Sequence, residues 1–383
     1  MEDWRHGGFG LYIHWPFCQS KCPYCDFNSH VAGFIDQKRW ARAYLSEIDR
    51  VGALTQGRLL QTVFFGGGTP SLMDAELVAT ILERVCRTWP MVNEPEVTLE
   101  ANPSSVEAAR FRAYRHAGVN RVSMGIQALN DMDLRRLGRL HTVQEAKEAF
   151  VVAQSVFDRV SFDLIYGRQD QTIADWRLEL GRALETARDH LSLYQLTIEP
   201  GTAFGDRFAR GGLLGLPSED LGADLYEVTQ ELCDAAGLQA YEVSNHALPG
   251  SESRHNLIYW RGGDYAGIGP GAHGRLTVAG TRWATESVRS PGAWLSAVER
   301  SGTGGLPDTA LTGEDRMQEY LLMGLRLSEG ISLNRLSSMS GSSLSDSKLK
   351  PLLDLDLIRV DGDRLSATPS GRLVLNGVLR ALV

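Results

Sequence analysis

The chain has 383 residues, 43% of them hydrophobic, and its 47 acidic residues against 39 basic ones give a net charge of −8. Proteins that bind phosphate backbones usually carry a basic excess, so this charge argues against a nucleic-acid partner. No apolar run approaches the roughly 18 residues that span a bilayer, and the polar start of the chain does not resemble a secretory signal. We therefore expect a cytoplasmic protein without a transmembrane segment, with one large domain and a smaller one.

The first half of the chain alternates short apolar runs with longer helical patterns. The runs that resemble strands are Gly10–Trp15, Thr62–Phe65, Glu96–Glu100, Arg121–Gly125, Arg159–Tyr166 and Leu191–Ile198. The helical patterns between them are Lys38–Leu54, Ala75–Trp89, Val106–His116, Gln144–Phe157 and Thr172–Arg188. This alternation predicts an α/β fold with a parallel sheet and helices outside it. Six such units can close into a partial (βα)6 TIM-like barrel; an open doubly wound sheet is the alternative that spacing leaves open.

A seventh unit is expected next, with a helix at Ser218–Ala236 and a strand at Ala240–Val243. Glycine-rich sequence follows at Gly262–Gly274, where the G-x-G-x-G run indicates a loop of close approach. Residues Ser301–Pro307 resemble a linker. We therefore expect a barrel over 1–245, a connecting segment over 246–306 and a C-terminal domain over 307–383.

The C-terminal part differs in character from the barrel. Glu314–Leu327 has the pattern of an amphipathic helix, and a helix, a turn and a second helix follow from Leu333. Leu357–Val360 and Arg364–Ala367 then flank a short turn as a small hairpin. This order is typical of a winged-helix-like domain, and the acidic chain favours a packing or partner role for it over DNA binding.

Three of the five cysteines, Cys18, Cys22 and Cys25, form a C-x3-C-x2-C cluster. An odd number of cysteines argues against a disulfide framework. Three thiolates on one loop can ligate three corners of an iron–sulfur cubane and leave the fourth iron open. Zinc is the alternative, but it needs a further ligand, for which only His14 and His30 lie near. The remaining cysteines lie inside helical patterns and are expected to be small buried hydrophobes: Cys86 and Cys233.

The cysteine segment resembles the radical S-adenosylmethionine (SAM) superfamily, whose signature has an aromatic residue before the last cysteine, here Tyr24. The resemblance implies a [4Fe–4S] cluster whose open iron is chelated by the amino and carboxylate groups of SAM. It also implies an electron donor, because one electron from the cluster cleaves SAM to methionine and a 5′-deoxyadenosyl radical. The protein's part in such chemistry is to position the cofactors and exclude water.

Further motifs of this superfamily follow the predicted strands, and in a βα barrel the active site lies at the carboxyl ends of the strands. The glycines of Gly66-Gly-Gly-Thr69-Pro70 let backbone N–H groups approach a ligand closely. The resemblance implies SAM contacts at Tyr12, Tyr24, Gly67, Gly68, Thr69, Glu100, Gln127, Arg139 and Asp163. Each of these residues alone also fits a structural role, but their order at strand ends indicates one pocket.

The motifs YIHxPFC, GGGTP, SMGIQ and DLIYG resemble more closely the coproporphyrinogen-oxidase-like group. That group holds an oxygen-independent coproporphyrinogen III oxidase, which decarboxylates two propionates, and HemW-type haem chaperones. The oxidase carries a fourth cysteine where this chain has Phe27, and a long N-terminal extension where 17 residues precede Cys18. The chaperones carry H-N-x-x-Y-W, which is present here from His255 to Trp260. All three features favour the chaperone.

The resemblance therefore implies a chain that binds haem and delivers it to an acceptor haemoprotein. An imidazole can ligate iron and aromatic faces can pack on the macrocycle, so His255, Tyr259 and Trp260 are the expected haem contacts. A structural role is the alternative for His255, and His273 is a second candidate for haem or SAM. The alternative functions are coproporphyrinogen III dehydrogenase and a radical SAM enzyme acting on another tetrapyrrole. No catalytic side chain is assigned.

Overall fold

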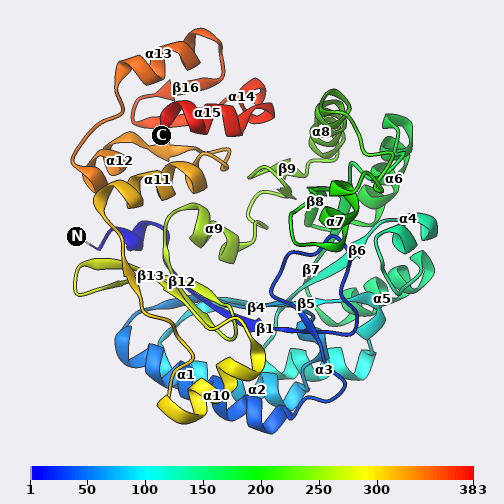
Figure 1. Ribbon diagram of the computed structural model, residues 1–383, viewed down its shortest axis with the longest axis vertical. Helices are drawn as coiled ribbons and strands as arrows, with labels where there is room; N and C mark the ends of the chain where they lie inside the picture. Colours follow the sequence, from blue (N-terminus) through cyan, green and yellow to red (C-terminus); the bar gives the residue numbers. More distant parts are fainter. Residues whose placement is uncertain (1) are drawn as a thin grey trace.

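The structure is a computed structural model that describes residues 2–383. Six parallel strands form its centre: β1 (Phe9–Trp15), β4 (Leu60–Gly67), β5 (Met91–Ala101), β6 (Arg121–Gln127), β7 (Arg159–Tyr166) and β8 (His190–Gln195). They lie side by side in chain order. A doubly wound sheet would instead reverse its order at a switch point. The predicted partial barrel is therefore confirmed, and Figure 1 shows its curved sheet.

Helices cover the outer face of these strands (Figure 1): α1 (Gln37–Leu54), α2 (Ala75–Thr88), α3 (Ala108–Ala117), α5 (Val143–Val156) and α6 (Ile173–Thr186). A short helix, α4 (Asp131–Arg136), follows β6. Both α5 and α6 begin with a capping box, Thr142 with Glu145 and Thr172 with Asp175. Such boxes satisfy the free N–H groups of the first turn, which explains why these helices begin where they do.

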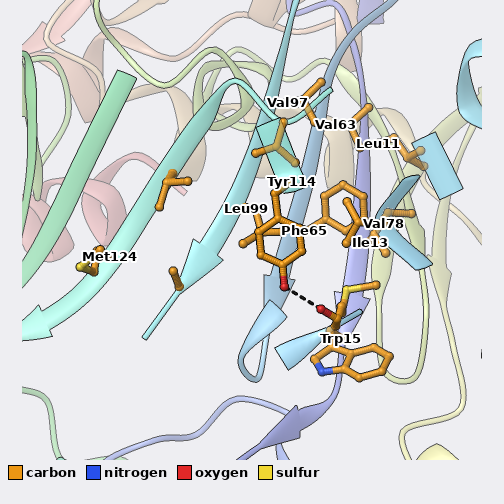
Figure 2. Close-up of a cluster of buried hydrophobic side chains, with 14 of the residues drawn as sticks. Leu11, Ile13, Trp15, Val63, Phe65, Val78, Val97, Leu99, Tyr114 and Met124 are labelled. Carbon is orange, nitrogen blue, oxygen red and sulfur yellow. Dashed lines mark hydrogen bonds between the residues drawn. The ribbon is translucent and has the colours of Figure 1, made fainter. Parts of the chain in front are cut away.

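The core lies between the sheet and these helices, and alternate strand residues build it. Figure 2 shows the fully buried side chains of neighbouring strands packed together, among them Leu11, Ile13, Val63, Phe65 and Leu99. Because strand side chains alternate between faces, the residues in between point into the barrel. Tyr12 and Phe64 are such residues, and their rings stack with centroids 6.2 Å apart. One face of the sheet thus makes a rigid core, and the other carries the polar residues of the site.

The predicted seventh strand at Ala240–Val243 is wrong. After α7 (Ala203–Ala209) and α8 (Glu219–Ala235), the chain forms two short strands, β9 (Gln239–Ala240) and β10 (Asn245–Ala247), and β10 pairs antiparallel with β8. The reason is a turn held by Glu242, whose Oε1 accepts bonds from the Ser244 N–H at 2.7 Å and from Asn245 Nδ2 at 2.6 Å. The apolar run therefore bends back instead of extending.

The segment 246–306, expected to connect two domains, extends the main sheet. It forms α9 (Arg254–Trp260), β11 (Asp264–Ile268), β12 (His273–Val278), β13 (Thr281–Glu286) and α10 (Pro291–Ser301), and β14 (Thr309–Ala310) adds the edge. Strand β11 pairs in parallel with β1. The glycine-rich run is thus a strand followed by a tight turn. The expected linker is packed as well, since the Gly304 N–H donates to Glu47 Oε1 at 2.8 Å in a buried contact.

The C-terminal domain has its own core and lies beside α9 (Figure 1). It consists of α11 (Gly313–Gly324), β15 (Ile331–Ser332), α12 (Leu333–Ser340), α13 (Asp346–Asp354), β16 (Ile358–Asp361), β17 (Arg364–Ala367), α14 (Pro369–Leu373) and α15 (Leu375–Leu382). The predicted helix–turn–helix and hairpin are confirmed. Arg335 fixes the domain to the barrel by donating to Asp3 Oδ1 at 2.8 Å and to the Arg261 carbonyl at 2.6 Å. No helix within residues 2–383 is long and apolar enough to cross a membrane.

Candidate functional site

The loop after β1 carries the three clustered cysteines to the carboxyl ends of the strands. Two short strands, β2 (Phe17–Cys18) and β3 (His30–Val31), pair with each other and close this loop on itself. Cys18, Cys22 and Cys25 are free thiols that line one pocket. Of the other two cysteines, Cys233 is buried as expected, whereas Cys86 is exposed, so the prediction for Cys86 is wrong.

The histidines that flank the three thiols are engaged by the cysteine loop itself. Within residues 2–383, no group of three His, Cys, Asp or Glu side chains is placed to hold one metal ion. The flanking histidines bond to the loop: His14 Nε2 donates to the Asn28 carbonyl at 2.9 Å, and His30 Nε2 lies 3.1 Å from Asn28 Oδ1. In this arrangement the Nε2 atoms of both histidines are occupied by Asn28.

Each cysteine sulfur has a polar neighbour. Thr69 Oγ1 donates to Cys18 Sγ at 3.4 Å, an Arg139 guanidinium nitrogen donates to Cys22 Sγ at 3.3 Å, and the Ser29 hydroxyl lies 3.8 Å from Cys25 Sγ. Burial raises the pKa of the Cys18 thiol, which the Thr69 bond opposes. Hydrogen bonds to ligand sulfurs orient the ligands and tune a bound cluster.

The GGGTP loop packs directly on the cysteine loop. The N–H groups of Gly68 and Thr69 donate to the Trp15 and Phe17 carbonyls at 2.7 and 2.8 Å. Gly67 has φ +110°, and a Cβ there would lie 2.5 Å from the His14 ring. Only glycine adopts this backbone without strain or collision, so the glycines bring the two loops together.

Two partly buried carboxyl groups, those of Glu100 and Asp163, line the same pocket as the cysteines. Glu100 accepts a bond from the Gly67 N–H at 3.2 Å, and burial together with the charge of Asp163 raises its pKa to about 8. Burial raises the pKa of Asp163 to about 6, although hydrogen bonds from Ser192 and Ser123 oppose the shift. Two such carboxyls in one pocket are typical of a site that binds a cationic or polyhydroxylated ligand.

Gln127 is held in a strained backbone at the end of β6. Its φ is +76°, and the pairing of β6 with β7 shifts register between Gly125 and Gln127. Left-handed non-glycine residues cost about 1–3 kcal/mol and cluster at functional sites. Arg139, which follows α4, donates to the Gly125 carbonyl at 2.8 Å. The bulge therefore directs both side chains toward the pocket.

These residues line one pocket with a void of about 760 Å³, including its mouth. Eight of the nine predicted SAM contacts lie in its wall: Tyr24, Gly67, Gly68, Thr69, Glu100, Gln127, Arg139 and Asp163. Tyr12 is not part of this wall, and its hydroxyl lies 3.1 Å from His14 Nδ1. Sequence reasoning missed further lining residues, among them Ser20, Ser29, Asn102, Ser123 and Gly125. The two-residue period of β6 would have indicated Ser123 and Gly125, which share a strand face with Gln127.

The H-N-x-x-Y-W motif forms α9, outside this pocket. His255 is 1% exposed, and both ring nitrogens have partners: Nδ1 lies 2.7 Å from Thr62 Oγ1 and Nε2 lies 2.5 Å from Tyr259 Oη. Burial lowers the pKa of His255 to about 3, so its imidazole is neutral. Trp260 packs under the Arg326 guanidinium, 4.8 Å from the ring centroid. The structure thus brings His255 and Tyr259 together, while Trp260 faces the C-terminal domain.

His273, the second candidate for haem or SAM, lies away from both groups. It begins β12 with its side chain 61% exposed, and Nε2 is 3.9 Å from Glu286 Oε1. It is not part of the cysteine pocket wall. Its neighbours in the glycine-rich turn do contact the cysteine loop, because Asn28 Nδ2 donates to the Pro270 carbonyl at 2.9 Å.

Comparison with known proteins agrees with this geometry. Residues 12–179 match the radical SAM superfamily, and residues 311–374 match the HemN C-terminal domain. The chain is 39% identical to the heme chaperone HemW of Escherichia coli (strain K12), over 96% of each chain. It is 37% identical to the mitochondrial radical S-adenosyl methionine domain-containing protein 1 of Bos taurus, over 97% of this chain and 87% of that one.

A solved structure shares the whole fold. Coproporphyrinogen III oxidase (HemN) from Escherichia coli superposes with a TM-score of 0.82 at 22% identity, over 98% of this chain and 90% of that one. At this identity the likeness shows the fold. The near full-length relatives at higher identity show the family: the chain belongs to the HemW family of radical SAM proteins.

Proposed function

We propose that this chain is a radical SAM haem chaperone, which binds a [4Fe–4S] cluster, SAM and haem and passes haem to an acceptor haemoprotein. The observation that carries the proposal is its relation, along nearly the whole of both chains, to the heme chaperone HemW of Escherichia coli. Phe27 at the position of the oxidase's fourth cysteine and the H-N-x-x-Y-W motif support the same assignment.

Cys18, Cys22 and Cys25 hold the cluster. When bound, the cluster supplies one-electron reduction and an open iron site for the amino and carboxylate groups of SAM. The chain contributes the donors on the sulfurs, of which Thr69 Oγ1 on Cys18 is one. An electron donor is required as a partner. Replacing Cys22 with Ala should abolish cluster uptake, measured as iron and sulfide per chain after anaerobic reconstitution. Cys86→Ala, at an exposed cysteine outside the loop, is the matched control.

The pocket beside the cysteines holds SAM. Glu100 accepts hydrogen bonds from the ribose hydroxyls, and carbonyl groups of the GGGTP loop accept from the amino end of the ligand, since the loop's N–H groups already donate within the protein. Arg139, with two donor nitrogens already directed at Cys22 and Gly125, orients the carboxylate end. The carboxyl groups of Glu100 and Asp163 favour the positively charged sulfonium when they are ionised. Tyr12 does not line the pocket; it supports the site through the contact of its hydroxyl with His14.

Haem binds at the H-N-x-x-Y-W motif, with His255, Tyr259 and Trp260 as contacts. Ligation of iron by His255 Nε2 requires that nitrogen to exchange its bond to the Tyr259 hydroxyl. The neutral imidazole suits this exchange, because a protonated ring could not coordinate a metal. Movement of Tyr259 alone frees the nitrogen, since Nδ1 keeps its contact with Thr62.

One experiment separates the proposal from its alternative. The reconstituted protein is titrated with haem and assayed with coproporphyrinogen III, SAM and a reductant. We expect about one haem per chain, transfer of that haem to an apo-haemoprotein, and no protoporphyrinogen IX. The alternative, coproporphyrinogen III dehydrogenase, is favoured by the fold shared with HemN. Robust turnover of coproporphyrinogen III without haem binding would show that the chain is this enzyme and not a haem chaperone.

A further inference from the structure

A second cavity lies between the strands that follow the H-N-x-x-Y-W motif and the C-terminal domain. Its void is about 590 Å³ including the mouth, and it shares no lining residue with the cysteine pocket. Tyr259 and Tyr265 line it from the barrel, and Tyr320, Met323 and Met339 from the C-terminal domain. Ligand sites are cavities of about 300–1,000 Å³ with mostly apolar walls and a few placed polar groups. The enclosed space of this cavity is about 130 Å³, which is room for the edge of such a ligand and not for a whole one, and its wall combines the tyrosines and methionines with charged side chains.

The walls suit a flat, unsaturated ring system. Tyr259 and Tyr265 meet edge to face with centroids 4.4 Å apart, so they form one aromatic wall of the cavity. Tyr320 is held by the bond that its hydroxyl accepts from the Ser332 N–H at 3.1 Å. Aromatic faces and thioethers make favourable contacts with π systems, and methionine adapts its shape to fill the remaining gaps.

The cavity also carries one arginine whose charge the protein neutralises only in part, because its carboxylate partner is shared. Arg282 pairs with Asp264 at 3.0 Å, and Arg275 pairs with Glu319 at 2.6 Å. The third lining arginine, Arg316, lies 3.9 Å from the carboxylate of Asp3. That carboxylate already accepts a bond from Arg335 at 2.8 Å.

The Arg316 guanidinium makes no hydrogen bond with any other group in the described part of the chain, although only 25% of its side chain is exposed. A guanidinium in a sheltered cavity is satisfied best by a carboxylate or phosphate in bidentate geometry. The free donors therefore indicate an anionic group on the ligand, in a protein whose overall charge of −8 would repel anions elsewhere.

We propose that this cavity holds the carboxylate-bearing edge of haem, with a propionate paired to Arg316 and the ring edge between the tyrosines and methionines. The proposal rests on the haem-binding function above and gives it a location. Tyr259 connects this cavity with the expected iron ligand, because it lines the cavity while its hydroxyl bonds to His255 Nε2 at 2.5 Å. Displacement of this hydroxyl by the ring would open the path between His255 and the iron.

The test compares haem with haem dimethyl ester, in which both carboxylates are blocked, by absorbance titration of the reconstituted full-length protein. Arg316→Gln removes the charge and keeps the size of the side chain. It should weaken haem binding at least tenfold and leave ester binding unchanged. The matched control is Arg300→Gln, at an exposed arginine in the last turn of α10. A second variant, Met323→Trp, fills the cavity and should weaken binding of both ligands. Iron content and SAM binding show that each variant is folded.

The titrations distinguish failure of the proposed haem-binding function from failure of the proposed propionate site. If the unmodified protein binds no haem, the proposed function fails. If it binds haem and Arg316→Gln binds haem equally well, the cavity is not the propionate site and only this inference fails. Equal binding of haem and its dimethyl ester by the unmodified protein also overturns the inference, because the carboxylates would then contribute nothing.

Discussion

Replacing Glu100 with Gln tests whether the pocket holds a carboxyl group that folding makes harder to ionise. Burial and the neighbouring Asp163 raise its pKa from 4.5 to about 8. A raised pKa means that the folded state keeps a proton that the unfolded state has lost. The stability from that proton is complete below pH 4.5 and disappears as the pH rises through 8. The wild-type protein should therefore lose stability on the alkaline side.

The size of the effect follows from the shift. Between pH 6 and pH 8 the unfolded carboxyl is ionised and the folded one is not, and each unit costs about 1.4 kcal/mol. Two units give about 2.7 kcal/mol, and screening by solvent at the open pocket reduces this to about 1–2 kcal/mol. Asp163, with a pKa of about 6, changes mostly below this window.

Urea unfolding of the cluster-free full chain at both pH values, followed by tryptophan fluorescence, measures the difference. The wild type should lose about 1–2 kcal/mol between pH 6 and pH 8 relative to Glu100→Gln. Glu94→Gln, at an exposed position of the same strand, should behave as the wild type. Parallel pH dependences for the wild type and Glu100→Gln would refute the reasoning.

Two further substitutions test the loops around the pocket. Gly67→Ala places a methyl group 2.5 Å from the His14 ring on a backbone at φ +110°, so SAM affinity should fall at least tenfold while iron content is kept. The control is Gly57→Ala, which has a φ of +76° and no neighbour within 4 Å, so it should bind SAM normally. If Gly67→Ala also binds SAM normally, the close packing of Gly67 on His14 does not shape the SAM site. Thr69→Val removes the donor to Cys18 Sγ and should make the cluster potential more negative in a redox titration monitored by EPR. An unchanged potential would mean that this bond is absent in the loaded protein.

The sequence predicted the six central strands well because each has apolar residues at the period that a buried strand requires. Strand β11 was not predicted, because its partner, β1, lies far away in the chain. The glycines in and around β11 also hide the alternation of apolar and polar residues that marks a strand. A similar limit applies to the site. The resemblance to the radical SAM superfamily implied eight residues that the structure places in the pocket wall, including Glu100 and Asp163. Whether His255 keeps a free nitrogen depends on Thr62 and Tyr259, and no local pattern encodes those contacts.

The anchor of the cysteine loop has a consequence for the order in which the protein is completed during translation. Asn28 Nδ2 donates to the Pro270 carbonyl and to the Arg289 carbonyl, at separations of 242 and 261 residues along the chain. Domains of a nascent chain generally fold as units while synthesis proceeds from the N-terminus. The cysteines leave the ribosome early, but the groups that fix their loop leave it only after most of the chain has been made. A truncated product that ends before residue 270 would carry all three thiols on an unanchored loop.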